Sequence, residues 1–194
     1  MNLINPIPLP LGMLVPQPRD FRHPSYVHGQ EHVSRVMIHA FLLLQLTRQP
    51  HLASALWASV YLHDLARTHD GLCYRHGADA ARRFHEYRPQ FQQAGLHPDE
   101  EHAVRTAVAW HAVPAELKRE HRHAPLVHLL KDADGLDRVR IGDLDPRYLR
   151  YRESHDLLDF AEVLFNRTHR RASPGANYFP WLWEQAQSLL KIAL

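Results

Sequence analysis

The segment 51–66 constrains the fold of this chain more than any other part of its sequence. Its apolar residues would point to nearly every side of a helix: Leu52, Leu56, Trp57, Val60, Tyr61, Leu62 and Leu65. A helix that is apolar all round is normally buried at the centre of a protein. The rest of the chain must therefore cover this segment, and 194 residues are enough for one domain with a substantial core.

The remaining sequence predicts further helices around this central one. Residues 33–44 carry apolar side chains at the i, i+3, i+4, i+7 spacing, and Pro50 then ends the pattern. Other helices are predicted over the ranges 76–87 (ending near Pro89), 99–111, 124–140, 154–171 and 179–192. The sequence shows no strand alternation, internal repeat or dividing linker. We therefore expect an all-α, single-domain helical bundle.

The first 26 residues are rich in proline and lack helical periodicity. They predict an extended arm, packed on the domain or on a partner. Residues 27–194 then form the helical domain, with its sequence motifs within 26–142 and C-terminal helices over 143–194.

Composition narrows the classes of function. A net charge of +2 is too small to indicate nucleic-acid binding, and the one cysteine, Cys73, excludes an internal disulfide. The longest apolar stretch, 36–46, is short and contains His39 and Gln45, so no membrane span is expected. The N-terminus lacks the early positive charge and unbroken apolar run of a signal peptide. We expect a cytoplasmic protein that stays out of membranes.

Seventeen histidines prompt a search for metal ligands. The pair His63-Asp64 ends the most apolar helix of the chain. An ionised carboxylate is costly there unless a cation or hydrogen-bond donors meet it. A bound metal would supply that charge, and the alternative is an Asp64 that pairs with Arg67 or is exposed on a loop.

Asp134 is the second candidate acid. At 100° per residue it shares a helix face with three apolar residues, whereas Asp132 points almost the opposite way; those residues are Val127, Leu130 and Ile141. We therefore expect Asp134, and not Asp132, to face the core. Gly135 follows it at a cost of roughly 1 kcal/mol relative to Ala, which favours close packing or ligand access. The alternative for Asp134 is an i, i+4 salt bridge to Arg138.

Two histidines lie on or beside the apolar face of a predicted helix. His111 lies on the face of Val104, Ala107 and Val108, as a ligand or as a buried core residue. His32 lies beside the apolar face of the first helix, as a ligand or on a solvated flank.

The order of these residues resembles the HD superfamily of metal-dependent phosphohydrolases. His32-Val-Ser-Arg35-Val36 is similar to its first histidine motif, His63-Asp64 to its defining doublet, and Asp132-Ala-Asp134-Gly-Leu to its closing aspartate motif. The resemblance implies a helical bundle in which one metal is held by His32, His63, Asp64 and Asp134.

A finer resemblance concerns the segment between the doublet and the last aspartate. His69-Asp70-Gly71 followed by His76-Gly77-Ala-Asp-Ala resembles a bacterial HD subgroup, and binuclear HD enzymes carry extra histidines in this interval. The resemblance implies a second metal at His76 and His111. Histidine and carboxylate ligands suit Mn, Fe, Co, Ni or Zn, with Mg as a further choice.

The implied reaction is attack of metal-activated water on a phosphomonoester or phosphodiester, with a nucleotide as the expected substrate. The catalytic candidates are Asp64, Arg67 and His28. The substrate-binding candidates are Arg35, Arg67, His76 and Arg138, since an arginine can hold phosphate with two hydrogen bonds.

Two alternatives remain open: a di-iron oxygenase on the same framework, and a non-catalytic module that binds a nucleotide or protein. Each of two basic clusters is open to two interpretations: it contacts a ligand, or it lies on the solvated surface. They are the segment Arg147–Arg152, which mixes arginine and tyrosine, and the group Arg167, His169, Arg170 and Arg171. The sequence does not indicate an oligomeric state.

Overall fold

The computed structural model describes residues 15–169 and 178–192. Regular structure within these residues is entirely helical, without a strand, so the all-α prediction is confirmed. None of the helices in these ranges is long and apolar enough to cross a bilayer. Most of the expected arm, residues 1–14, lies outside the described residues, as do Arg170 and Arg171.

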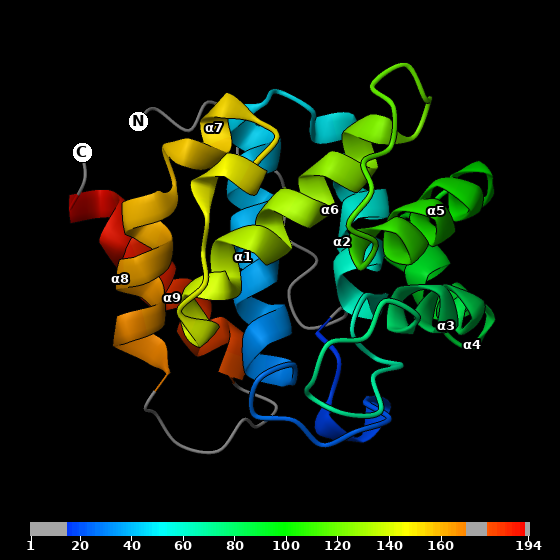
Figure 1. The fold of residues 1–194 in the computed structure, drawn as a ribbon, viewed down its shortest axis with the longest axis horizontal. Coiled ribbons are helices and arrows are strands. Elements are labelled where there is room, and N and C mark those ends of the chain that lie inside the picture. Colours follow the sequence, from blue (N-terminus) through cyan, green and yellow to red (C-terminus); the bar gives the residue numbers. More distant parts are fainter. Residues whose placement is uncertain (1–14, 170–177, 193–194) are drawn as a thin grey trace.

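Three helices form the centre of the molecule: α1 (Gln30–Leu46), α2 (Ala53–Leu62) and α6 (Ala124–Leu136). α1 packs against both α2 and α6 (Figure 1). Every residue of α2 from Ala55 to Leu62 is buried, as its apolar sequence predicts. The central helix therefore brings its C-terminal residues, His63 and Asp64, into the interior.

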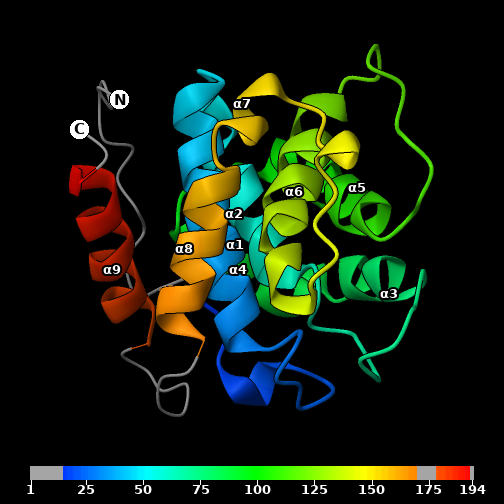
Figure 2. The ribbon, with the colours of Figure 1, turned by 60° about the vertical axis from the view of Figure 1, so that its left-hand side comes forward.

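Two groups of helices flank this centre, one on each side (Figures 1 and 2). The first group packs on α2 and α6 through α5, and consists of α3 (His76–Arg82), α4 (Phe84–Gln93) and α5 (Glu101–His111). The second packs on α1 and consists of α7 (Arg152–His155), α8 (Leu158–Thr168) and α9 (Tyr178–Ile192). Short 3-10 helices connect them: η1 (Pro18–Asp20), η2 (Pro50–Leu52), η3 (Pro98–Glu100), η4 (Asp137–Ile141) and η5 (Pro146–Tyr148).

The expected stop at Pro89 is wrong. The chain breaks at Arg83 instead, and Pro89 lies inside α4. Proline removes the bond to the carbonyl four residues earlier, that of His85, and His85 is exposed. Phe84 and Phe91 are buried on either side of Pro89, so packing keeps the helix together.

The described part of the proline-rich segment packs on the domain. The Asp20 carboxylate accepts a hydrogen bond from the Tyr61 hydroxyl at 3.1 Å, and the Asp20 carbonyl accepts one from Arg83 at 3.1 Å. The Arg22 amide donates to the Leu65 carbonyl at 3.0 Å. Residues 15–26 are thus tied to the end of α2, beside the doublet.

The expectation that Asp132 faces away from the core is also wrong. Its side chain is fully buried and accepts hydrogen bonds from the amides of Arg150 and Tyr151 and from the Ser154 hydroxyl at 2.6–3.0 Å. The Arg150 guanidinium adds a charged bond at 3.1 Å. Helical phase correctly separated the two acids, but the face of Asp132 is covered by the segment that leads into α7.

We predict that Asp132→Asn destabilises the fold by about 3 kcal/mol, because it leaves buried donors and Arg150 without their carboxylate. Urea unfolding measures this change. Asp143→Asn is the matched control: Asp143 pairs with Arg138 on the surface, where a pair contributes about 0–1 kcal/mol. Equal losses in both variants would contradict the assigned role of Asp132.

His39 is a fully buried histidine on α1. Its Nδ1 lies 3.3 Å from the Ala133 carbonyl, and its Nε2 has no hydrogen-bond partner. Burial lowers its pKa from 6.5 to about 4. The folded protein therefore keeps His39 neutral, whereas the unfolded chain binds a proton below about pH 6.5.

His39 should therefore weaken the fold as the pH falls from 6.5 toward 4, and its contribution should be constant above that range. Between pH 7 and pH 5 we expect about 2 kcal/mol of acid destabilisation from this residue. In denaturant unfolding, the free energy lost between pH 7 and pH 5 should be about 2 kcal/mol smaller for His39→Leu than for the wild type. A His51→Leu control, at an exposed site, should not; if the two variants respond alike, His39 is not the group responsible.

Candidate metal centre

The centre is built around the Asp64 carboxylate, which follows the buried end of α2 and is 4% exposed. The predicted contact with Arg67 is present, with Arg67 Nε 3.1 Å from Asp64 Oδ1. It does not replace the histidine contacts, because the two carboxylate oxygens face different histidine groups. Asp64 therefore contacts Arg67 and the surrounding histidines together.

The first group surrounds Asp64 Oδ2 and contains His32, His63 and Asp134. His32 Nε2 lies 3.1 Å from His63 Nε2, 3.3 Å from Asp134 Oδ1 and 3.4 Å from Asp64 Oδ2. His63 Nε2 lies 3.8 Å from the same Asp64 oxygen. The residues expected to hold one metal are thus brought together from α1, the end of α2, and α6.

The second group surrounds Asp64 Oδ1 and contains His76 and His111. His76 Nε2 lies 3.0 Å from that oxygen and 3.0 Å from His111 Nε2, and His111 Nε2 lies 3.8 Å from the oxygen. Gly77 permits this approach of α3 to α5, since a Cβ there would lie 2.5 Å from the Val108 carbonyl oxygen. The residues expected to hold a second metal are also together.

Hydrogen bonds at the opposite ring nitrogens fix the protons of these histidines. The Nδ1 atoms of His63, His76 and His111 each lie 2.6 Å from a backbone carbonyl three residues earlier. A carbonyl only accepts, so each Nδ1 carries the proton and each Nε2 of a neutral ring has a lone pair. The facing pairs of Nε2 atoms at 3.0–3.1 Å therefore need a cation between them, either a proton or a metal ion.

Burial and the surrounding charges set the ionisation of the first group. Burial by itself would lower the pKa of His32, but hydrogen bonds to Asp134, Asp137 and Asp64 raise it to about 9. Burial lowers the pKa of His63 to about 3. Burial opposes ionisation of Asp64 and Asp134, yet the nearby histidines hold the pKa of both carboxyls well below its usual range. The group is thus two carboxylates around a position that attracts positive charge.

The spacing of the donor atoms fits a transition metal. A metal at ~2.1 Å from each ligand places neighbouring ligands about 3.0 Å apart at right angles and about 3.4 Å apart in a tetrahedron. The distances above, 3.0–3.8 Å, span this range. Histidine and aspartate groups that could hold a metal are therefore present as three overlapping triads: His28, His32 and Asp64; His32, His63 and Asp134; and Asp64, His76 and His111.

Asp137 accepts a hydrogen bond from His32, a role that the sequence did not predict. Its fully buried carboxylate accepts from His32 Nδ1 at 2.7 Å and from Arg35 Nε at 2.6 Å. Such an acceptor fixes the ring orientation of a metal ligand. Arg35, expected to bind substrate, is buried and paired with Asp137 instead. The i, i+3 spacing of Asp134 and Asp137 was the available signal.

Arg140, and not Arg138, lies beside the site. The Arg140 guanidinium is 3.3 Å from His28 Nδ1 and donates to the Val27 carbonyl at 2.9 Å. Arg138 was expected to contact substrate or Asp134 but pairs with Asp143 on the surface. The 3-10 geometry of η4, which follows α6, determines which arginine turns inward.

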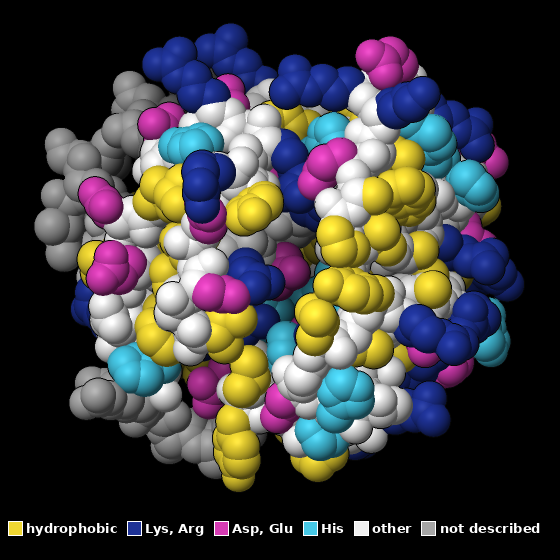
Figure 3. Space-filling model, viewed as in Figure 1, with side chains coloured by type: hydrophobic (Ala, Val, Ile, Leu, Met, Phe, Trp, Pro, Cys, Tyr) yellow, Lys and Arg dark blue, Asp and Glu magenta, His cyan; other side chains and the backbone are white. Residues whose placement is uncertain are grey.

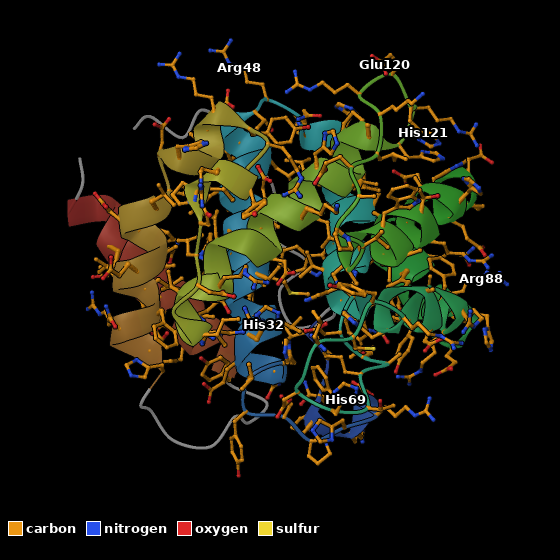
Figure 4. The ribbon with its side chains drawn as sticks, in the orientation of Figure 1. His32, Arg48, His69, Arg88, Glu120 and His121 are labelled. Atoms are coloured by element: carbon orange, nitrogen blue, oxygen red, sulfur yellow. The ribbon has the colours of Figure 1, made fainter. Side chains whose placement is uncertain are left out.

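His28 precedes α1 and lies 2.8 Å from Asp64 Oδ2 through Nδ1. It therefore contacts the shared carboxylate, which is compatible with its expected place in the catalytic site. His32 and the loop that carries His69 are marked in Figure 4. The face drawn in Figure 3 is hollowed near its centre, where histidine, acidic and basic side chains meet.

Comparison of the chain with protein-family models, with curated proteins and with solved structures found no match. Its function is therefore inferred from the geometry of the site.

We predict that the purified protein binds up to two divalent ions per chain, and that His111→Gln reduces this to one because only the second position loses a ligand. Elemental analysis after loading with Mn, Co, Ni, Fe or Zn measures the stoichiometry. Thermal unfolding should also show stabilisation of about 3 kcal/mol at a metal concentration 100 times Kd. His85→Gln, at an exposed histidine, is the control; unchanged stoichiometry in His111→Gln would remove His111 from the site.

Proposed function

We propose that this protein is a metal-dependent phosphohydrolase of the HD type, with two adjacent metal positions that share Asp64. The observation that carries the proposal is the division of the Asp64 carboxylate, with one oxygen toward His32 and the other toward His76. Sites with two metal ions are common in enzymes that cleave phosphate esters.

The order of the ligands along the chain supports the HD assignment. His32 comes from α1, His63 and Asp64 follow α2, and Asp134 comes from α6. His76 begins α3 and His111 ends α5, between the doublet and the last aspartate. The motifs that resemble the superfamily in their order along the chain thus also supply side chains that lie close together in space.

When bound, the metals would supply a lowered water pKa and charge stabilisation at a phosphoryl oxygen. The chain's own groups would orient the substrate. Arg67 is bonded to Asp64 and to the Gly71 carbonyl at 3.3 Å, so its guanidinium is held beside the metal positions. Arg140 is held in the same way by the carbonyls of Val27 and Asp137, to which it donates. Two fixed guanidinium groups favour an anionic ester, and we propose a nucleotide as its class.

The proposed role of His28 is to keep a proton beside the reacting group. Its Nδ1 is bonded to Asp64, and Arg140 packs against the same nitrogen. These contacts hold the ring in one orientation, as a group that moves a proton requires.

We predict hydrolysis of phosphomonoesters or phosphodiesters in a panel run with Mn, Co, Ni, Mg and Fe. His63→Ala and Asp64→Asn should each lower kcat/KM by more than the ~10–100-fold typical of losing a hydrogen bond to a metal ligand. Asp137→Asn should fall within that ~10–100-fold range, because it leaves all ligands in place. His85→Ala, on the surface, should retain full activity.

Activity that survives both His63→Ala and Asp64→Asn would falsify the metal-site proposal. An iron-loaded protein with redox-dependent absorption and no hydrolysis would identify the oxygenase alternative. A metal-loaded protein that binds nucleotide but is inert across the panel would identify a binding module.

A further inference from the structure

A cavity lies toward the N-terminal end of α6, away from the candidate metal centre. Its volume is about 270 Å³, and its polar lining consists of Arg119, His128, Arg150, Tyr151 and Arg152. His128 and Asp134 are six residues apart on α6, which is roughly 9 Å along the helix axis. The loop whose tip carries Glu120 and His121 in Figure 4 contributes Arg119.

Some of the charged groups at this cavity are balanced by opposite charges. Arg150 is already bonded to Glu116 at 2.5 and 3.0 Å and to Asp132 at 3.1 Å. Lys131, which shares Glu116 with Arg150, donates to the Val113 and Ala115 carbonyls and lies 3.4 Å from Glu116. These two cations and two acids compensate one another.

Arg119 and Arg152, by contrast, have no acidic partner among residues 15–169 and 178–192. Both side chains are exposed and line the cavity. Their guanidinium groups therefore remain as uncompensated charges that face a concave surface.

The Tyr151 hydroxyl and His128 Nε2 at this cavity already bond to other groups of the protein. The Tyr151 hydroxyl donates to the Pro125 carbonyl and accepts from Gln49, each at 3.3 Å. His128 Nε2 lies 3.2 Å from the Leu117 carbonyl, to which it donates. The two rings thus offer ring surface, while the free hydrogen-bond donors are those of the arginines.

We propose that this cavity binds a phosphoryl anion, either inorganic phosphate or the phosphate of a nucleotide. The guanidinium fork matches phosphate oxygens in geometry and charge, and two of them here lack a counter-charge. The volume is just below the ~300 Å³ lower limit of typical small-molecule pockets, which suits a small anion. The site does not depend on the proposed metal chemistry.

This assignment divides the basic segment Arg147–Arg152. Arg147 pairs with Asp145 at the surface, at 2.6 Å, and does not line the cavity. Arg150, Tyr151 and Arg152 do. In this proposal residues 150–152 contact the ligand, whereas Arg147 belongs to the solvated surface.

The test is an NMR titration of the full chain with inorganic phosphate and, separately, with adenosine monophosphate. The amides of residues 150–152 report on this cavity and are remote from the metal centre, where phosphate could also bind. We expect saturable shifts at these amides. Arg119→Gln/Arg152→Gln should raise the apparent Kd at least about ten-fold, because it removes both free charge-assisted donors.

The matched control is Arg122→Gln/Arg147→Gln, which removes the same charge from neighbouring arginines outside the cavity lining. It should leave the Kd unchanged. Equal weakening in both double variants, or no saturable shift at residues 150–152, overturns the proposal. Tighter binding of the nucleotide assigns a role to the Tyr151 and His128 rings, and equal affinities assign binding to the phosphoryl group alone.

Discussion

A carboxylate buried at the end of the most apolar helix is the constraint on which the centre of this protein depends. Asp64 is carried inward by α2, and an ionised group there requires compensation. The chain compensates it with histidines on one oxygen and with histidines and Arg67 on the other. Those partners come from separate helices, so the packing of the bundle also brings the residues of the site together.

The histidines are useful as ligands because the backbone fixes them. Three of them donate Nδ1 to a carbonyl three residues earlier, and His32 donates to Asp137, which Arg35 holds in turn. These bonds select the tautomer and leave Nε2 toward the shared carboxylate. The site is thus organised by groups outside it, including Gly77, whose missing side chain lets α3 approach α5.

Some sequence expectations failed where long-range packing overrode a local rule. Pro89 did not end its helix, because Phe84 and Phe91 hold it on both sides. Asp132 was expected to face away from the core, but the segment at residues 150–154 covers it and uses it as an acceptor. Helical phase gives the direction in which a side chain points. It does not show which other segment of the chain covers that face of the helix.

By itself, the sequence determined the all-α class and the buried central helix, and the resemblance of its motifs suggested an ordered set of residues: His32, His63, Asp64, His76, His111 and Asp134. Periodicity and residue chemistry are local properties, so they can be obtained from the sequence alone. Only the tertiary structure decided that the two Asp64 oxygens serve different histidine groups, that Asp137 and Arg35 support His32, and that Arg140 turns inward while Arg138 does not. Those outcomes depend on contacts between residues as many as 112 positions apart, which only the packing of the fold determines.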